Sequence, residues 1–390
     1  MALRFVRQFI KLESSSGIVL FVAAVLAMII DNTPFSVYYD SFFHSTLQIS
    51  IDHYQLSKPL LTWINDGLMT VFFLLVGLEV KREILHGELN TVRKATLPAI
   101  AAAGGMLVPA LIYVGVNWHD RFALQGWAIP AATDTAFALA ILALLGKRVP
   151  VSLKIFLTAL AIFDDIGAII VMALFYSKNI SFVMLLIALS LICVLFLLNY
   201  VGVKKIMPYF FVGLLLWLCV LQSGVHATLA GIVLAMMIPL DSADHPHHRS
   251  PSEALERKLH PLVGFVILPL FAFANAGVSF HGIKWHDLLA PIPLGIASGL
   301  FFGKQIGIWG ATLLAVKTKF VRLPSDITSF SVYGMSLVAG VGFTMSLFIG
   351  MIAFHSINPF AAYVRIGVIV GSILSGFAGY WVLRWVYRRV

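Results

Sequence analysis

Runs of about 20 apolar residues recur along this chain, and each is long enough to cross the roughly 30 Å hydrocarbon core of a membrane as a helix. Hydrophobic residues make up 60% of the 390 residues and charged residues only 12%, whereas a soluble domain is about half apolar and a quarter charged. The sequence therefore predicts one all-α polytopic transmembrane domain over residues 1–390. Its twelve predicted helices are residues 13–31, 60–83, 95–116, 122–145, 150–176, 182–200, 206–220, 223–240, 256–276, 290–313, 327–352 and 359–385.

Positive charges are distributed unevenly between the loops that join these segments. When alternate loops are assigned to one side of the membrane, 21 of the 27 Lys and Arg residues fall on that side. The opposite loops carry only Lys58, Arg121, Lys178 and Lys284. Cytoplasmic loops are enriched in Lys and Arg, so we predict that both termini are cytoplasmic. The formal net charge of +9 then reflects topology and anionic lipid, and not nucleic-acid binding.

Two adjacent carboxylates stand in the middle of one apolar run, LTALAIFDDIGAIIVMALF, at Asp164 and Asp165. Asp134 and Lys304 lie similarly deep in other runs. A charged side chain in hydrocarbon is costly unless it is paired, so an intramembrane acid is a functional candidate by default. The alternative for the Asp pair is a structural role, as a neutral hydrogen-bonded acid or as a buried ion pair with Lys304.

Two of the predicted helices contain residues that interrupt a helix. In WAIPAATDTAFALAIL, Pro130 removes a backbone donor, and Thr133 and Asp134 compete with the helix by bonding to backbone groups. In SLVAGVGFTMSLFIG, Gly340 and Gly342 weaken the middle of the segment, although small residues also serve close helix packing. We predict that both helices are discontinuous near the middle of the membrane.

The two interrupted helices occupy corresponding positions in the two halves of the chain. Paired interruptions of this kind indicate a transporter built from inverted-topology repeats, with its ion site between them. We predict repeats over residues 95–176 and 290–385, with two discontinuous helices that cross at mid-membrane. Each half-helix end carries about half an elementary charge. Asp134 would then offset the facing N-termini and Lys304 the facing C-termini.

The oxygens at these positions suit a small, hard cation that competes with protons. Carboxylates, the Thr133 hydroxyl and backbone carbonyls freed at a helix break are the ligands that coordinate Na⁺ in such transporters. Protons bind the same carboxylates, so competition between Na⁺ and H⁺ at Asp164 and Asp165 is sufficient for exchange. A lysine paired with Asp164 would be displaced by Na⁺. Because a buried lysine deprotonates readily, Lys304 itself is a candidate proton carrier.

Five longer motifs resemble those of one family. TDTAFALAIL, ALAIFDDIGAIIVMALF, LQSGVHATLAG, ILPLFAFANAGVSF and GVGFTMSLFI are similar to segments of the NhaA-type bacterial sodium/proton antiporters, and the resemblance runs almost end to end. It implies a twelve-helix protein of the bacterial inner membrane that exchanges cytoplasmic Na⁺ or Li⁺ for external protons electrogenically. The implied role is sodium and pH homeostasis, with no enzymatic activity, no catalytic residue and no cofactor.

The resemblance also implies roles for individual residues. Asp164 and Asp165 match the ion-binding pair, Thr133 and Asp134 lie nearby at the helix crossing, and Lys304 matches the lysine that partners the first aspartate. The candidates for a pH response lie elsewhere. They are Glu79, Arg82, Glu83, His226, Glu256 and His260. At Glu253, Ala254 and Arg257 the chain departs from the lysine, arginine and histidine expected of the family, which puts the pH threshold in doubt.

Further sequence features bear on the partners of the protein and on alternative functions. Residues 45–59, STLQISIDHYQLSKP, alternate enough to predict a periplasmic hairpin that could pair with a second copy in a homodimer. The remaining partners are sodium, protons and membrane lipids. An intramembrane aspartyl protease is disfavoured because the chain lacks a GxGD signature. A Na⁺-coupled symporter of an organic solute stays the alternative, since it would also use buried acids.

Overall fold

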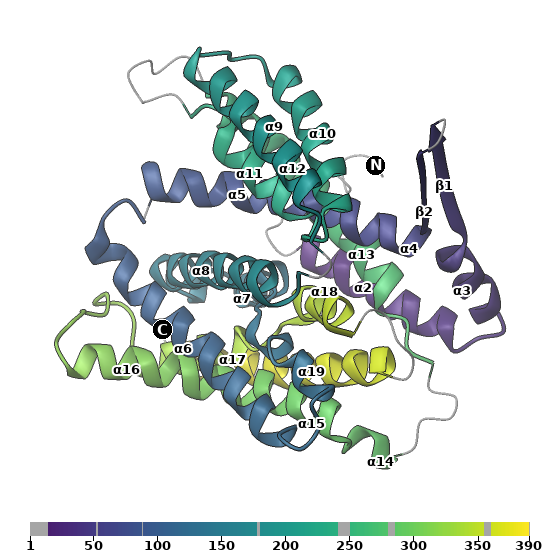
Figure 1. Cartoon of the computed structure of the whole chain (residues 1–390). Coiled ribbons are helices and arrows are strands. Elements are labelled where there is room, and N and C mark those ends of the chain that lie inside the picture. Colours follow the sequence, from purple (N-terminus) through teal and green to yellow (C-terminus); the bar gives the residue numbers. More distant parts are fainter. Residues whose placement is uncertain are drawn as a thin grey trace, which may run out of the picture. The chain divides into compact units, whose positions relative to one another are not determined.

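The computed structural model describes residues 15–51, 54–87, 89–177, 180–240, 250–279, 285–354 and 360–389. The chain divides into two compact units (Figure 1). The first unit combines Met1–Asn32, Thr91–Ala168 and Asn275–Val390, and the second combines Thr33–Asn90 and Ile169–Ala274. Each unit is therefore assembled from segments that lie far apart in the sequence.

Membrane-length helices dominate the described residues, which confirms the predicted polytopic all-α class. Eight helices are long and apolar enough to cross a membrane, or up to ten if each of two bent helix pairs is one span. All twelve predicted segments contain helix. Some fall short of the length criterion because the helix is bent or short, as in α10 (Ile206–Gln222) and α11 (Leu229–Met237).

The first unit contains the helices on which the predicted ion-site residues lie. Its elements are α2 (Ser15–Asp31), α6 (Val92–Val116), η2 (Ala123–Gly126), η3 (Ile129–Ala131), α7 (Thr135–Leu144), η4 (Gly146–Arg148), most of α8 (Val151–Phe175), α14 (Trp285–Leu288), α15 (Pro291–Ser298), η6 (Gly299–Gly303), η7 (Gln305–Trp309), α16 (Gly310–Lys317), α17 (Ser329–Val338), α18 (Phe343–Phe354), α19 (Phe360–Val386) and η8 (Tyr387–Arg389).

Both predicted interruptions are present, and they meet. The backbone is extended at Ala132 and Asp134, between η3 and α7, and a second break separates α17 from α18, whose axes differ by 50°. The Asp134 backbone N–H donates to the Val341 carbonyl at 2.7 Å. A proline before one break and glycines in the other supply the local cause.

Glycines bring the Lys304 segment close to α6 in the first unit. Gly299, Gly303 and Gly307 recur every four residues, and a Cβ at Gly303 would lie 2.6 Å from the Pro109 Cα. A Cβ at Gly307 would lie 2.1 Å from the Gly104 carbonyl oxygen. Only a residue without a side chain permits this approach, as in other small-residue helix interfaces. The segment is π-helical on both sides of Lys304, a local distortion that often accompanies functional sites.

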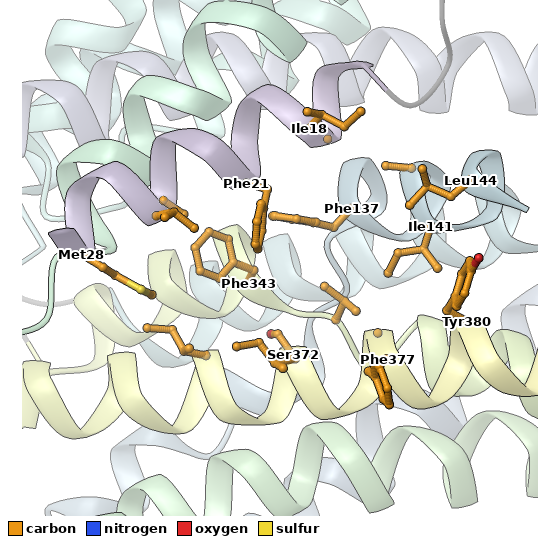
Figure 2. Close-up of a pocket in the computed structure, with 18 of the residues that line it drawn as sticks. Ile18, Phe21, Met28, Phe137, Ile141, Leu144, Phe343, Ser372, Phe377 and Tyr380 are labelled. Atoms are coloured by element: carbon orange, nitrogen blue, oxygen red, sulfur yellow. The ribbon is translucent and has the colours of Figure 1, made fainter.

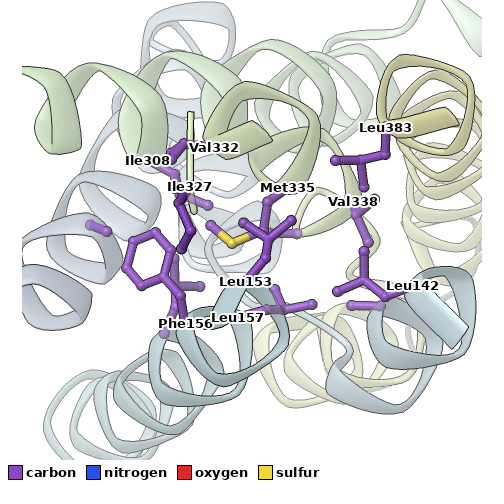
Figure 3. Packing of buried hydrophobic residues seen from close by; sticks show 14 of the residues in the cluster. Leu142, Leu153, Phe156, Leu157, Ile308, Ile327, Val332, Met335, Val338 and Leu383 are labelled. Atoms are coloured by element: carbon purple, nitrogen blue, oxygen red, sulfur yellow. The ribbon is translucent and has the colours of Figure 1, made fainter. Parts of the chain in front are cut away.

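A hydrophobic cluster fills the space between α7, α8, α17 and α19 in the first unit (Figure 3). Leu153 and Leu157 of α8 are completely buried, as is Met335 of α17. Leu142 of α7 and Leu383 of α19 complete the same cluster. These contacts hold α7, α17 and α19 against α8, which carries the carboxylate pair.

The second unit contains the remaining helices and the two strands. Its elements are α3 (Ser36–His44), β1 (Thr46–Ile51), β2 (Tyr54–Pro59), α4 (Leu60–Trp63), η1 (Ile64–Leu68), α5 (Met69–Leu85), α9 (Phe182–Tyr200), α10, α11, α12 (Pro251–Leu262), η5 (Val263–Ile267) and α13 (Leu268–Asn275). β1 and β2 pair antiparallel from Thr46↔Pro59 to Ile51↔Tyr54, in the segment where the alternation predicts a hairpin (Figure 1). The periplasmic location of this hairpin stays a prediction.

Candidate functional site

Asp164 and Lys304 form a completely buried ion pair in the first unit. The Lys304 Nζ lies 2.7 Å from the Asp164 Oδ2, and both side chains have no exposed surface. Asp164 lies on α8, and Lys304 lies between the π-helical turns η6 and η7. The sequence suggested an ion pair between these two residues, and a role of Asp164 in ion binding stays a prediction.

Lys304 uses all three of its donors. Besides Asp164, its ammonium group donates to the Ala131 carbonyl at 2.7 Å and to the Thr133 hydroxyl oxygen at 2.9 Å. Ala131 ends η3 immediately before the break, so its carbonyl lies at a C-terminal helix end. The lysine charge therefore neutralises both a carboxylate and the partial negative charge of a helix terminus.

Thr133 connects the ion pair to the second break. Its hydroxyl lies 2.6 Å from the Asp164 Oδ2 and 3.0 Å from the Ala339 carbonyl oxygen, so it can donate to either one. Ala339 is the C-cap residue of α17 and directly follows its last residue, Val338. One hydroxyl thus lies within hydrogen-bond distance of a carboxylate, an ammonium group and a freed carbonyl, which are groups from three separate segments.

Asp134 caps the two helices that begin at the breaks. Its Oδ1 accepts the Phe137 backbone N–H at 3.2 Å at the start of α7. Its Oδ2 accepts the Thr344 backbone N–H at 2.9 Å and the Thr344 hydroxyl, at the start of α18. A carboxylate between two helix N-termini offsets the partial positive charge of both. The geometry therefore matches the compensating role that we predicted for Asp134.

The second carboxylate of the pair is also buried. Asp165 is 6% exposed and follows Asp164 on α8, so its side chain points about 100° away around the helix axis. The Asp164 Oδ1 is buried and has no hydrogen-bond partner within the described structure. A buried oxygen without a donor is costly unless something binds it. This Asp164 oxygen is therefore available to a ligand.

The second unit holds a network of charged side chains between the C-terminal half of α5 and the middle and last turn of α12. The Arg82 Nε donates to both carboxylate oxygens of Glu256, at 3.0 and 3.2 Å, and the Arg82 Nη1 lies 2.7 Å from the Glu83 Oε1. The His260 Nε2 lies 3.6 Å from the Glu79 Oε1. Five of the six predicted pH-response residues therefore lie within ion-pair distance of another member of the set.

His226 lies elsewhere in the second unit, half-buried in the turn that precedes α11. Its part in a pH response stays a prediction. Three members of the charged network, Arg82, Glu256 and His260, line a pocket of about 390 Å³ together with Glu253 and Arg257. These are two of the positions at which the sequence departs from the expected family pattern.

Sequence reasoning missed some groups that complete the crossing. Thr344 binds Asp134 through both its backbone N–H and its hydroxyl, and the carbonyls of Ala131 and Ala339 accept from Lys304 and Thr133. The position of Thr344, two residues after Gly342, carries a usable signal, since a threonine at a helix start is a common capping residue. The two alanine carbonyls carry none.

Comparisons of the sequence with known proteins point to one family. A family model described as Na⁺/H⁺ antiporter 1 matches residues 7–383. The chain is 55% identical to the Na⁺/H⁺ antiporter NhaA of Rhodospirillum rubrum, over 98% of each chain. It is 52% identical to the Na⁺/H⁺ antiporter NhaA 1 of Syntrophotalea carbinolica, over 100% of this chain and 98% of that one. It is 51% identical to the Na⁺/H⁺ antiporter NhaA of Serratia proteamaculans, over 99% of each.

Proposed function

This chain belongs to the Na⁺/H⁺ antiporter 1 family, and from this premise we propose that it exports cytoplasmic Na⁺ or Li⁺ in exchange for external protons. It is a sodium/proton antiporter, a secondary transporter rather than an enzyme. The observation that carries the mechanism is the buried Asp164–Lys304 pair at the point where two broken helices meet. A membrane protein retains such a costly pair where its charges are used.

Sodium enters this site by taking the place of Lys304 on Asp164. The Asp164 Oδ1 is buried without a donor, and the Thr133 hydroxyl lies 2.6 Å from the other oxygen of the same carboxylate. Asp165 and the carbonyls freed at the breaks supply further oxygen ligands, which a hard cation prefers. Protons bind the same carboxylates, so the site holds either the cation or protons, and each expels the other.

Lys304 makes the exchange electrogenic. When Na⁺ neutralises Asp164, the ammonium group loses the partner that stabilised its charge, and an unpaired buried lysine releases its proton. Lys304 then releases one proton to the cytoplasm for each sodium ion that binds at Asp164. Sodium also displaces protons from the carboxylates. More than one proton per sodium moves a net charge across the membrane.

The two broken helices form the pivot of transport. Asp134 between two N-termini and Lys304 beside a C-terminal carbonyl keep the crossing neutral. We assign the inverted repeats to residues 95–176 and 290–385, with the ion site between their breaks. Movement of one repeat against the other exposes the site to each side in turn.

The network on α5 and α12 is the proposed pH-responsive element. The Glu79–His260 contact is an ion pair only when the imidazole is protonated, and an imidazole changes charge within the range pH 5–8. The neighbouring Arg82 guanidinium holds the Glu256 carboxylate in place. His226 is a further candidate, and Glu83 shares the Arg82 guanidinium.

The membrane setting completes the proposal. The protein resides in the bacterial inner membrane with both termini cytoplasmic, as the distribution of Lys and Arg predicts. It pairs with a second copy through the β1–β2 hairpin, contacts anionic lipids, needs no cofactor and serves sodium and pH homeostasis. A Na⁺-coupled symporter, the alternative from the sequence, has no support, because the curated relatives are named antiporters.

The deciding experiment measures Na⁺-driven proton flux in proteoliposomes that contain no organic solute. Asp164→Asn and Asp165→Asn should each abolish the flux while the protein stays folded in the membrane. The matched control is Asp40→Asn, which removes one carboxylate from an exposed position on α3. Normal flux in both Asp164→Asn and Asp165→Asn would refute the proposed mechanism. Flux that appears only when an organic solute is added would refute the antiport function.

A further inference from the structure

A second, apolar pocket of about 660 Å³ lies within the first unit, away from the ion pair, between α2, α7 and α19 (Figure 2). Apart from Ser372, Tyr380 and Trp381, its lining residues are Gly, Ala, Val, Ile, Leu, Met and Phe. Pockets of about 300–1,000 Å³ are the size that binds small molecules. The pocket has almost no polar group to hold water, so a hydrocarbon ligand is the occupant that its chemistry favours.

The rim of the pocket is exposed to the surroundings of the protein. Phe21 of α2 is 55% exposed, and Ile373 and Phe377 of α19 are 60% and 67% exposed. In a membrane protein these side chains face lipid, so hydrocarbon can enter from the bilayer. Filling such a recess restores the dispersion contacts that its lining would otherwise lack.

The length of the pocket matches one lipid leaflet. Along α19 its lining runs from Ile369 to Trp381, which is about 18 Å at 1.5 Å per residue. Half of the hydrocarbon core is about 15 Å. A single acyl chain of one leaflet therefore spans the pocket from end to end.

One end of the pocket carries a positive charge. The Arg384 guanidinium lies 5.2 Å from the ring centroid of Trp381 and 6.0 Å from that of Tyr380, and both rings line the pocket. Stacking on two aromatic rings holds the guanidinium at that end. Arginine binds phosphate oxygens well, so this end complements an anionic lipid headgroup whose chain lies among the apolar residues.

The inner wall of the pocket includes the helix crossing. Phe137 and Phe343 lie edge to face with ring centroids 5.4 Å apart (Figure 2). The Phe137 N–H donates to Asp134, and Val341, another lining residue, accepts from the Asp134 N–H. A chain in the pocket therefore packs against the residues that join the two breaks.

We propose that this pocket binds one acyl chain of an anionic membrane phospholipid, with its phosphate on Arg384, and that the bound lipid stabilises the helix crossing. The site is separate from the ion pair and does not depend on the transport mechanism.

Native mass spectrometry of the full chain in dodecyl maltoside, with added palmitoyl-oleoyl phosphatidylglycerol or phosphatidylcholine, tests the proposal. The wild type should bind phosphatidylglycerol more tightly. Arg384→Gln should weaken phosphatidylglycerol binding about fivefold, which corresponds to about 1 kcal/mol for one basic residue near a lipid surface. It should weaken phosphatidylcholine binding less, because the choline cation offsets the phosphate charge. The matched control is Arg322→Gln, an exposed arginine in the loop between α16 and α17 of the same unit.

A second variant fills the pocket. Ser372→Leu adds hydrocarbon, and the Ser372 hydroxyl has no hydrogen-bond partner within the described residues, so no such bond is lost. It should weaken the binding of both lipids at least fivefold. Added phosphatidylglycerol should raise the melting temperature of the wild type and of Arg322→Gln more than that of either test variant. Equal binding and equal thermal shifts in all four proteins would overturn the proposal, as would equal affinity of the wild type for the two lipids.

Discussion

Replacing Lys304 by glutamine separates the structural role of this residue from its role in proton transfer. Lys304 is completely buried and donates three hydrogen bonds. Its removal leaves the Asp164 carboxylate buried without its cation, a change that costs about 3–5 kcal/mol. At about 2 °C per kcal/mol for a long chain, the melting temperature should fall by roughly 6–10 °C.

The transport assay follows membrane potential together with Na⁺ flux in proteoliposomes. If Lys304 releases a proton in each cycle, Lys304→Gln loses that proton, and exchange becomes electroneutral or stops. Lys304→Arg should be nearly as damaging, because arginine does not deprotonate at working pH. Lys317→Gln is the matched control, since it removes an exposed lysine at the end of the following helix, α16.

Two results would refute this reasoning. Electrogenic exchange that survives in Lys304→Gln would exclude Lys304 as an obligatory proton carrier. An unchanged melting temperature of Lys304→Gln would show that the Asp164–Lys304 pair does not contribute the expected free energy to folding. Much of the activity persisting in Lys304→Arg, together with a lower melting temperature in Lys304→Gln, would leave the lysine a purely structural residue.

Three further predictions concern other parts of the chain. Asp134→Ala removes the cap of two helices, at about 1 kcal/mol each, so it should lower the melting temperature and weaken apparent Na⁺ affinity without abolishing transport; complete inactivation of a normally folded protein would make Asp134 a direct ligand. Gly303→Ala places a Cβ 2.6 Å from the Pro109 Cα and should reduce both stability and transport, whereas Gly310→Ala, whose Cβ meets nothing within 4 Å, should be tolerated. His260→Gln removes the partner of Glu79 and should shift the pH dependence of transport while leaving the maximal rate unchanged; an identical pH profile would exclude this pair from pH sensing.

The helix breaks could be predicted because their causes are local. Pro130, Thr133 and Asp134 act on the backbone within one turn, and the glycines at 340 and 342 act on their own segment. The membrane setting of Asp164 was equally visible, because an acid within a run of apolar residues stands out in any window of the sequence. These features need no knowledge of which segments meet in space.

Except for Asp164, the partners of Lys304 could not be predicted, because they depend on how distant segments pack. The Ala131 carbonyl is an acceptor only because η3 ends where Lys304 passes. Glycines bring the Lys304 segment onto α6, in a contact between residues about 200 positions apart in the sequence. The sequence predicts twelve membrane-spanning segments, whereas eight to ten helices among the described residues are long enough to span. The two numbers differ because a break or bend shortens a helix without changing the hydropathy of its segment.

The bonds of Lys304 also explain how a buried ion pair can be opened by a weakly held cation. Losing a partner usually strands a buried charge at a cost of several kcal/mol. When Na⁺ takes Asp164, however, the ammonium group still has the Ala131 carbonyl and the Thr133 hydroxyl as acceptors, at 2.7 and 2.9 Å. The Ala131 carbonyl is at the C-terminal end of η3, where backbone carbonyls carry partial negative charge. In the proposed mechanism, these two acceptors hold the Lys304 side chain in place when Na⁺ takes Asp164 from it.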